Sequence, residues 1–280
     1  MYGHVDVMTS VTAQAKQAAR SPWVERLGTF GWLAKGILYL VLAVLALQVA
    51  LGTPGGESAD QQGALQELAD RPFGAVLLAV MAAGLAGYGL WRLIDAALAR
   101  SNDAKATAER VGHVLSGLIH LGLAVVAVRL LQGRGSQSGN AQAETLTAKV
   151  LDLPAGRWLV GLVGLAIAAV GAYFAKQGWE RLFLDELDLT GAGPGERSLI
   201  ERTGVLGNVA RGVVFALIGW FLIRAAVQYD ATEAKGLDGA LRTLVDRPYG
   251  PLLLGIVAIG LAMYGAFAAL SARHRRPPGS

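Results

Sequence analysis

The chain contains no cysteine and little charge. The absence of cysteine excludes disulfides, iron–sulfur clusters held by thiolates and zinc–thiolate sites. Only 16% of the 280 residues are charged, against about 25% in a typical soluble domain. This shortage does not indicate disorder, because disordered chains are poor in apolar residues and 53% of this chain is hydrophobic. The composition therefore points to a membrane protein.

Six apolar stretches have the length of membrane-spanning helices, which is about 20 residues for a hydrocarbon core of about 30 Å. A soluble bundle of buried helices is the alternative, but its helices would show a polar face and these show almost none. We predict an all-α polytopic membrane protein with six transmembrane helices. The predicted spans are 27–50, 73–98, 111–132, 156–178, 204–228 and 249–272.

The distribution of Lys and Arg predicts the orientation. Outside the deep parts of the helices, twelve of these residues lie on the side that carries both termini, and seven lie on the opposite side. Positively charged loops favour the cytoplasm, and six crossings place both termini on one side. We therefore expect a multi-pass protein of the bacterial cytoplasmic (inner) membrane with cytoplasmic N- and C-termini.

An internal repeat is the strongest pattern in the chain. A shift of 176 residues aligns its first and last thirds without a gap, and a weaker copy that contains Gly117 lies between them. Each unit is predicted to consist of a helix, an outer loop and a second helix. Because each unit crosses the membrane twice, all copies insert in the same orientation. We predict three parallel tandem helical hairpins around a pseudo-threefold axis, not the inverted repeats of many transporters. The matched motif residues are Gly36 with Gly212, Arg71, Pro72 and Gly74 with Arg247, Pro248 and Gly250, and Tyr88 with Tyr264.

The repeat defines the domain layout. Each outer loop carries a short amphipathic segment, which we expect to lie on the outer surface, and the Pro after it suits the first turn of the next helix. The predicted parts are a flexible cytoplasmic N-terminus (1–22), repeat 1 (23–100), repeat 2 (108–184), a cytoplasmic linker (185–198), repeat 3 (199–273) and a basic tail (274–280).

These motifs in combination resemble a bacterial membrane family catalogued as a domain of unknown function, DUF1206. The shared pattern is Lys or Arg before Gly in the first helix, Arg-Pro-aromatic-Gly after the outer segment, and Gly-Leu-x-x-Tyr-Gly in the second helix. The resemblance covers about residues 23–272 and implies three two-helix units in a bacterial inner membrane. The middle copy departs from it, because Ser116 stands where the other copies have Lys35 and Arg211. The family has no established activity, so the resemblance implies no chemistry.

Lys35 and Arg211 are the deepest charges of the predicted helices. Lys35 lies nine residues inside Arg26, which is about 13 Å deeper along a helix. Three interpretations remain open: snorkelling toward the cytoplasmic face, a structural ion pair, and a contact to a pore or substrate. We predict that both side chains point into the bundle and meet Asp95 or Glu180.

No catalytic constellation, phosphate loop or metal-ligand spacing is present in the sequence. His113 and His120 lie about 10.5 Å apart on one helix face, which does not suit a shared metal ion or a haem. His120 is interpreted chiefly as a polar core residue bonded to a carbonyl, with a proton relay as the alternative. We expect that the protein binds no metal ion and no cofactor and that it is not an enzyme.

Two charged segments are assigned to the surface. The acidic cluster 185–188 is interpreted as a solvated face, and the basic residues 273–276 are expected to sit on anionic headgroups. Small residues at four-residue spacing predict close helix contacts, either within the chain or with a second copy.

Two functional classes remain open. A non-catalytic membrane scaffold that binds a partner is favoured by the scarcity of polar residues inside the membrane. The alternative is a transporter or channel for a small solute or ion along a polar seam between the hairpins. The expected partners are the lipid bilayer and either another membrane protein or a second copy, with no nucleic acid.

Overall fold

The computed structural model describes residues 22–53, 57–98, 104–135 and 137–277 of the chain. The predicted flexible N-terminus, residues 1–22, lies outside the described residues except for Pro22.

Six long helices form the body of the protein, and each is long and apolar enough to cross a membrane. Between them lie three short helices, α3 (Gln61–Ala69), α6 (Gly139–Leu151) and α9 (Leu237–Val245). One lies in each loop that joins the two long helices of a repeat, and we call these the outer loops after the predicted orientation. The described residues form no strand. They contain only an isolated bridge between Leu187 and Arg275. The chain is an all-α polytopic membrane protein. Its long helices are α2 (Pro22–Ala50), α4 (Gly74–Leu98), α5 (Ala104–Leu131), α7 (Gly156–Trp179), α8 (Pro194–Gln228) and α10 (Gly250–Ser271).

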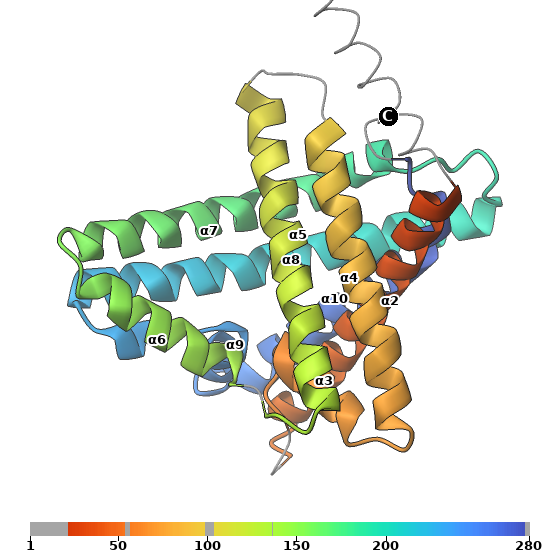
Figure 1. Ribbon diagram of the computed structural model, residues 1–280. Coiled ribbons are helices and arrows are strands. Elements are labelled where there is room, and N and C mark those ends of the chain that lie inside the picture. Colours follow the sequence, from red (N-terminus) through yellow and green to blue (C-terminus); the bar gives the residue numbers. More distant parts are fainter. Residues whose placement is uncertain (1–21, 54–56, 99–103, 136, 278–280) are drawn as a thin grey trace, which may run out of the picture.

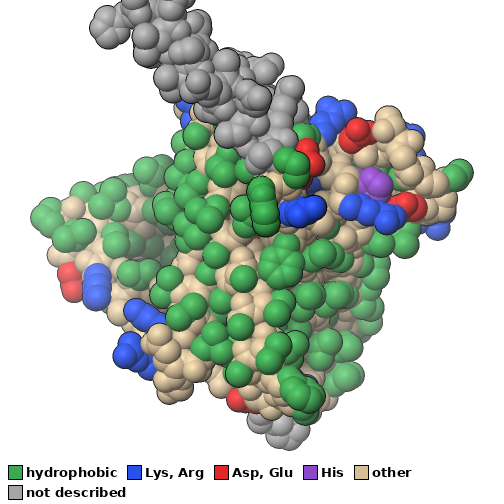
Figure 2. All heavy atoms as spheres, turned by 45° about the vertical axis from the view of Figure 1, so that its right-hand side comes forward, with side chains coloured by type: hydrophobic (Ala, Val, Ile, Leu, Met, Phe, Trp, Pro, Cys, Tyr) green, Lys and Arg blue, Asp and Glu red, His purple; other side chains and the backbone are tan. Residues whose placement is uncertain are grey.

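Large apolar side chains cover the outside of the molecule. Leu118, Leu162 and Ile256 are examples, with 55–64% of each side chain exposed. Figure 2 shows a broad hydrophobic face between two edges where charged side chains gather. Exposed apolar surface on this scale is unfavourable in water, and it identifies lipid as the solvent around the helices.

The helices pair across the repeat boundaries. The closest partners are α7 with α8, α10 with α2, and α4 with α5, and Figure 1 shows α7 beside α8 and α4 beside α5. Within the first and third repeats, α2 also packs on α4 and α8 on α10. In contrast, α5 and α7 share no extensive contact. The second predicted hairpin is therefore splayed, and the helices follow the order α5, α4, α2, α10, α8, α7.

At least one glycine pair lies at each of the three boundaries. In each pair, a Cβ on the first-helix glycine would come within 3 Å of the carbonyl oxygen of the other glycine. Backbones in lipid approach this closely only where both residues are small, and dispersion then holds the helices together. The pairs are Gly36 with Gly265, Gly117 with Gly89, and Gly212 with Gly171.

A second glycine contact closes the first and third repeats but not the second. A Cβ on Gly31 would lie 2.6 Å from the backbone nitrogen of Tyr88, and a Cβ on Gly207 would lie 2.5 Å from Cα of Tyr264. Five residues before Gly117 the second repeat has Gly112, and a Cβ there would meet nothing within 4 Å. The residue before Gly171 is Val170, where the other repeats have tyrosine.

The Arg-Pro-aromatic-Gly motif of the first and third repeats, and Leu-Pro-Ala-Gly in the second, form the turns between the outer helices and the next long helices. Phe73, Ala155 and Tyr249 adopt left-handed backbone angles, with φ of 61–64°. The long helices begin at the glycine that follows, so each proline precedes its helix instead of entering the first turn, which corrects that expectation. A Cβ on Gly74 would lie 1.9 Å from the Ala69 carbonyl oxygen, so the turn requires glycine.

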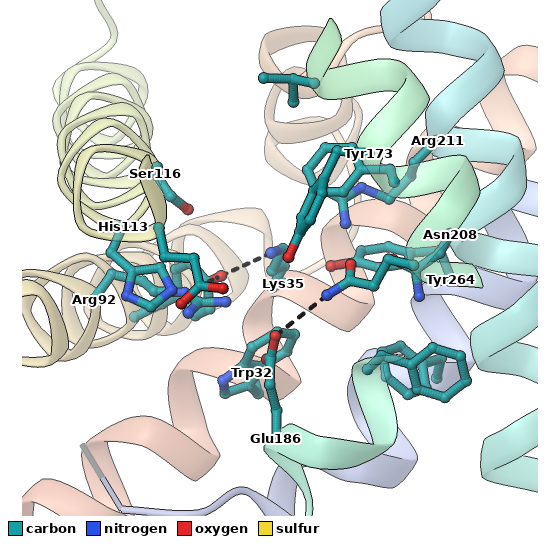
Figure 3. Close-up of a pocket in the computed structure, with 18 of the residues that line it drawn as sticks. Trp32, Lys35, Arg92, His113, Ser116, Tyr173, Glu186, Asn208, Arg211 and Tyr264 are labelled. Carbon is teal, nitrogen blue, oxygen red and sulfur yellow. Dashed lines mark hydrogen bonds between the residues drawn. The ribbon is translucent and has the colours of Figure 1, made fainter. Parts of the chain in front are cut away.

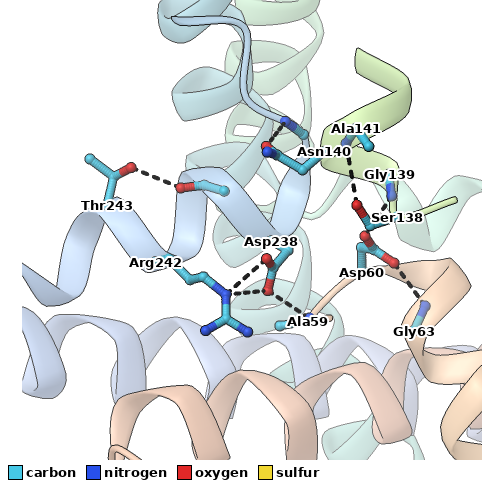
Figure 4. Close-up of polar contacts among 12 residues, drawn as sticks. Ala59, Asp60, Gly63, Ser138, Gly139, Asn140, Ala141, Asp238, Arg242 and Thr243 are labelled. Atoms are coloured by element: carbon cyan, nitrogen blue, oxygen red, sulfur yellow. Dashed lines mark hydrogen bonds and ion pairs between the residues drawn. The ribbon is translucent and has the colours of Figure 1, made fainter. Parts of the chain in front are cut away.

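The three outer helices are joined in a ring by hydrogen bonds between repeats (Figure 4). The Gly139 amide donates to Asp60, the Gly236 amide donates to Asn140, and the Ala59 amide donates to Asp238, at 2.8–3.0 Å. Asp60 also caps α3 by accepting from Gln62 and Gly63. Burial raises the pKa of Asp60, although these amide donors oppose the shift. The ring covers the outer end of the bundle.

Candidate functional site

A cavity of about 510 Å³ lies where the second repeat fails to close. Residues of α5, including Gly112 and Ser116, form one wall, and residues of α7, including Val170 and Tyr173, form another. Figure 3 shows Ser116 and His113 on one side, Tyr173 on the opposite side, and Lys35 between them. The volume is in the range of small-molecule sites.

Cations outnumber carboxylates in this inner cavity. Its lining includes four cationic and two acidic side chains, together with several aromatic rings. A low-dielectric, cation-rich pocket attracts anions. The four cations are Lys35, Arg92, Arg211 and Arg275, and the two acids are Glu109 and Glu186.

Lys35 is held among aromatic rings and not by a carboxylate. It is 3% exposed, and its Nζ donates to the Tyr88 hydroxyl at 2.8 Å. The same nitrogen lies 4.7 Å from the Trp32 ring centre and 4.4 Å from that of Tyr88. Arg92 Nε also donates to the Tyr88 hydroxyl, at 3.0 Å. One hydroxyl therefore serves two buried cations, and cation–π contacts supply the remaining stabilisation.

Arg211 occupies the position equivalent to Lys35 in the third repeat. It is 9% exposed, and its guanidinium carbon lies 4.0 Å from the Phe174 ring centre and 4.2 Å from that of Tyr264. No carboxylate of the described residues forms a salt bridge with it or with Lys35. These two positive charges are therefore not neutralised within the described part of the protein.

Arg275 and Glu186 close the inner end of the cavity, which corrects two expectations. Arg275 does not extend toward headgroups: its Nη1 lies 2.6 Å from Glu186 Oε2, and its guanidinium stacks 3.5 Å from the Trp32 ring centre. Glu186 likewise faces the cavity and accepts from Gln177 Nε2 at 3.3 Å. Burial would raise the pKa of Glu186, but the charges of Arg275 and Arg92 outweigh it and hold that pKa below its usual value.

Three buried donors of side chains that line the cavity have no hydrogen-bond partner among the described residues. They are Nε1 of Trp32 and the Nε atoms of Arg211 and Arg275. Burying a donor without an acceptor costs about 1–3 kcal/mol. Because all three groups are donors, each lacks an acceptor, and a side-chain shift would be needed for a ligand in the cavity to reach them.

A second cavity of about 440 Å³ lies under the outer ring. Asp60, Gln62 and Gln142 line its outer end, and Tyr39 and Arg211 line its inner end. Arg211 belongs to the lining of both cavities. The two spaces therefore follow each other along the bundle, with Arg211 at their boundary.

The predicted carboxylate partners lie elsewhere. Asp95 lies 3.2 Å from His113 Nδ1 and 3.6 Å from Arg92, while Glu180 is half exposed and pairs with Lys176 at 3.8 Å. Neither pairs with Lys35 or Arg211, so that part of the prediction is wrong. The reason is that the aromatic rings of neighbouring helices fill the space around both cations.

His120 lies beside the cavity in a structural position. Its Nδ1 is 2.7 Å from the Ser116 carbonyl oxygen, and its ring packs 4.4 Å from the Tyr88 ring. No group of three His, Asp or Glu residues in the described part of the chain is arranged to hold a metal ion.

The repeat motifs divide between architecture and site. Tyr88 and Tyr264 line the inner cavity, whereas the motif glycines form helix contacts and the remaining motif residues form the outer turns. The architectural residues are Gly36, Gly117, Gly212, Arg71, Pro72, Gly74, Arg247, Pro248 and Gly250.

Sequence reasoning missed Arg92, Glu186 and Arg275 as site residues. Arg92 follows Tyr88 by four positions, which places both on one helix face, so that spacing was an available signal. Glu186 and Arg275 are 89 residues apart, and no local pattern joins them.

Comparison with known proteins places the chain in a family. The model described as "Domain of Unknown Function (DUF1206)" matches three times, at residues 30–99, 111–181 and 206–275. The chain belongs to this family. It is 34% identical over 250 residues to "Uncharacterized protein YxxB" of Bacillus subtilis (strain 168), covering 88% of this chain and 90% of that protein. No solved structure matches.

Proposed function

We propose that this protein binds a small organic anion inside a bacterial cytoplasmic membrane and passes it across, with both termini in the cytoplasm. The observation that carries the proposal is the pair of cavities that share Arg211, a buried cation whose Nε has no partner. A scaffold needs no such cavities, so they favour the transporter over the partner-binding alternative.

The chemistry of the path fits an anion with an apolar or aromatic body. Lys35 and Arg211 supply two positive charges without a carboxylate partner, and Phe174 and Tyr264 supply flat apolar surface beside them. Buried charges inside a membrane mark substrate pathways because their cost is otherwise uncompensated. Arg211 lies where an anion leaving one cavity would enter the other.

The test uses the full chain in proteoliposomes and benzenesulfonate, an aromatic anion that stays ionised at neutral pH. We expect radiolabelled benzenesulfonate to enter faster than into empty vesicles, and Arg211→Gln to slow entry at least about tenfold, which corresponds to about 1.4 kcal/mol. Arg211→Lys keeps the charge and should retain part of the rate. Benzyltrimethylammonium, a cation of similar shape, should not be carried.

The matched control is Arg197→Gln, which removes an exposed arginine from the same helix outside both cavities. Its transport rate should equal that of the unmodified chain. Equal rates for Arg211→Gln and the unmodified chain would contradict the proposed path.

A further inference from the structure

The inner cavity has a side wall that faces the hydrocarbon of the membrane. The spans of α5 and α7 are the least buried of the six. Val170 and Tyr173 line the cavity, yet 41% and 44% of them is exposed. Gly112 on the facing helix is exposed, with open space around its Cα. The cavity therefore communicates with the lipid between these two helices.

The polarity of the cavity changes with distance from this side opening. Ala169 and Val170 lie at the opening and are apolar, whereas Lys35 and Arg211 lie in the interior and are buried. A ligand that fits both regions has a charged head and an apolar tail. The head would lie among the cations, and the tail would extend between α5 and α7.

The unsatisfied donors identify the charge of the head. Trp32 Nε1, Arg211 Nε and Arg275 Nε belong to side chains that line the cavity, and these buried atoms have no acceptors among the described residues. Hydrogen bonds from arginine to an ionised oxygen are about twice as strong as neutral ones. A phosphate or sulfonate head group carries a negative charge and acceptor oxygens, which match the buried cations Lys35 and Arg211.

We infer that the inner cavity is a site for an amphipathic anion, with a phosphate-like head group and a single apolar tail, which enters sideways from the lipid between α5 and α7. The inference rests on the proposed function and narrows it by naming the ligand class and the entry route. A transmembrane helix of a partner is the competing occupant of the opening. It is disfavoured because it would bury the cationic interior without supplying acceptors.

The experiment compares two anions that share one head group. Decanesulfonate and methanesulfonate differ only in the tail, and both remain ionised. Their binding is measured on the full chain in phosphatidylcholine nanodiscs. We expect decanesulfonate to bind at least about tenfold more tightly, after correction for its partitioning into empty nanodiscs. Gly112→Trp should then weaken decanesulfonate binding about tenfold, because the indole fills the opening.

Gly255→Trp is the matched control, since Gly255 lies on α10 and a Cβ there also meets nothing within 4 Å. Melting temperatures of both variants show whether each is folded. Loss of binding in Gly112→Trp alone supports lateral entry, and equal loss in both variants overturns it. Competition by one-tailed decanoyl lysophosphatidylglycerol, but not by decanoyl lysophosphatidylcholine, would identify a membrane lipid as the source of the head group.

The outcomes separate this inference from the proposed function. Equal affinity for the two sulfonates, with loss of both in Arg211→Gln, would overturn the amphipathic ligand and leave the anion site standing. Binding of either anion that is unaffected by Arg211→Gln would overturn the anion site itself. Copurification of one stoichiometric membrane protein that is lost in Gly112→Trp, without sulfonate binding, would assign the opening to a partner helix.

Discussion

The first and third repeats are closed, and the second is open. In the closed repeats a glycine of the first helix lies against the backbone of a tyrosine in the second helix. In the second repeat the glycine is Gly112, the tyrosine is replaced by Val170, and the helices part to leave the inner cavity. The comparison teaches that a repeat protein can form a site by relaxing one of several equivalent contacts while the others keep the fold.

The largest expected effect tests this difference directly. Gly31→Leu and Gly207→Leu should each lower the free energy of unfolding by about 3 kcal/mol, because overpacking against backbone cannot be relieved by a side-chain rotation. Gly112→Leu should change it by no more than about 0.5 kcal/mol, since its Cβ meets open space. Unfolding in SDS, followed by circular dichroism, measures all three. Equal destabilisation would show that the second repeat is as closed as the others.

The two site tyrosines provide a smaller contrast. Tyr88→Phe removes the acceptor of both Lys35 and Arg92, and we expect a loss of about 2 kcal/mol because two buried cations lose a partner. The Tyr264 hydroxyl has no hydrogen bond among the described residues, so Tyr264→Phe should cost less than about 0.5 kcal/mol. The same unfolding measurement applies, and the reverse order of the two losses would contradict the assignment.

The outer ring should respond more weakly to the loss of one cap. Asp60→Ala removes the acceptor of the Gln62, Gly63 and Gly139 amides, and we expect a loss of about 1 kcal/mol, typical of a helix cap. Hydrogen exchange of α3 and of the start of α6 should both increase. Ser138→Ala is the control, because Ser138 caps α6 alone and should leave exchange in α3 unchanged.

The smallest effect concerns pH at the inner end. The pKa of Glu186 is lower in the folded protein than its usual value of 4.5, so its ion pair with Arg275 stabilises the fold above pH 4.5. That contribution disappears as the pH falls through the folded pKa. Between pH 6 and pH 3, the melting temperature of the unmodified chain should therefore fall further than that of the Glu186→Gln variant. The control Glu25→Gln, at an exposed position, should lose as much melting temperature as the unmodified chain. Identical losses in all three proteins would show that the ionisation of Glu186 does not contribute to stability.

Much of the fold followed from the sequence because it depends on local and periodic properties. The six spans, the three units and the membrane environment can all be derived from apolar runs and from motifs such as Gly36 and Gly212. The pairing of helices could not be derived, because a glycine marks a close contact without naming its partner. Gly36 meets Gly265 of another repeat, not a residue of its own repeat.

The site was predictable only in part for the same reason. The depth of Lys35 and Arg211 in the membrane could be predicted from the rise of a helix. Their surroundings could not, because the rings of Tyr88, Phe174 and Tyr264 approach them from other helices. The expected carboxylate partners were wrong, since aromatic rings and one hydroxyl stabilise these cations instead.

The sequence by itself determined the solvent, the number of crossings and the threefold repetition, because each is a property of segments about 20 residues long. Only the tertiary structure decided that one repeat opens, and that Arg275 and Glu186 turn inward and join the two repeated cations around a cavity. The physical reason is that contacts between distant segments depend on how surfaces fit together. Chemically similar repeats fit differently when the residues at their contacts differ, as Val170 differs from Tyr88 and Tyr264.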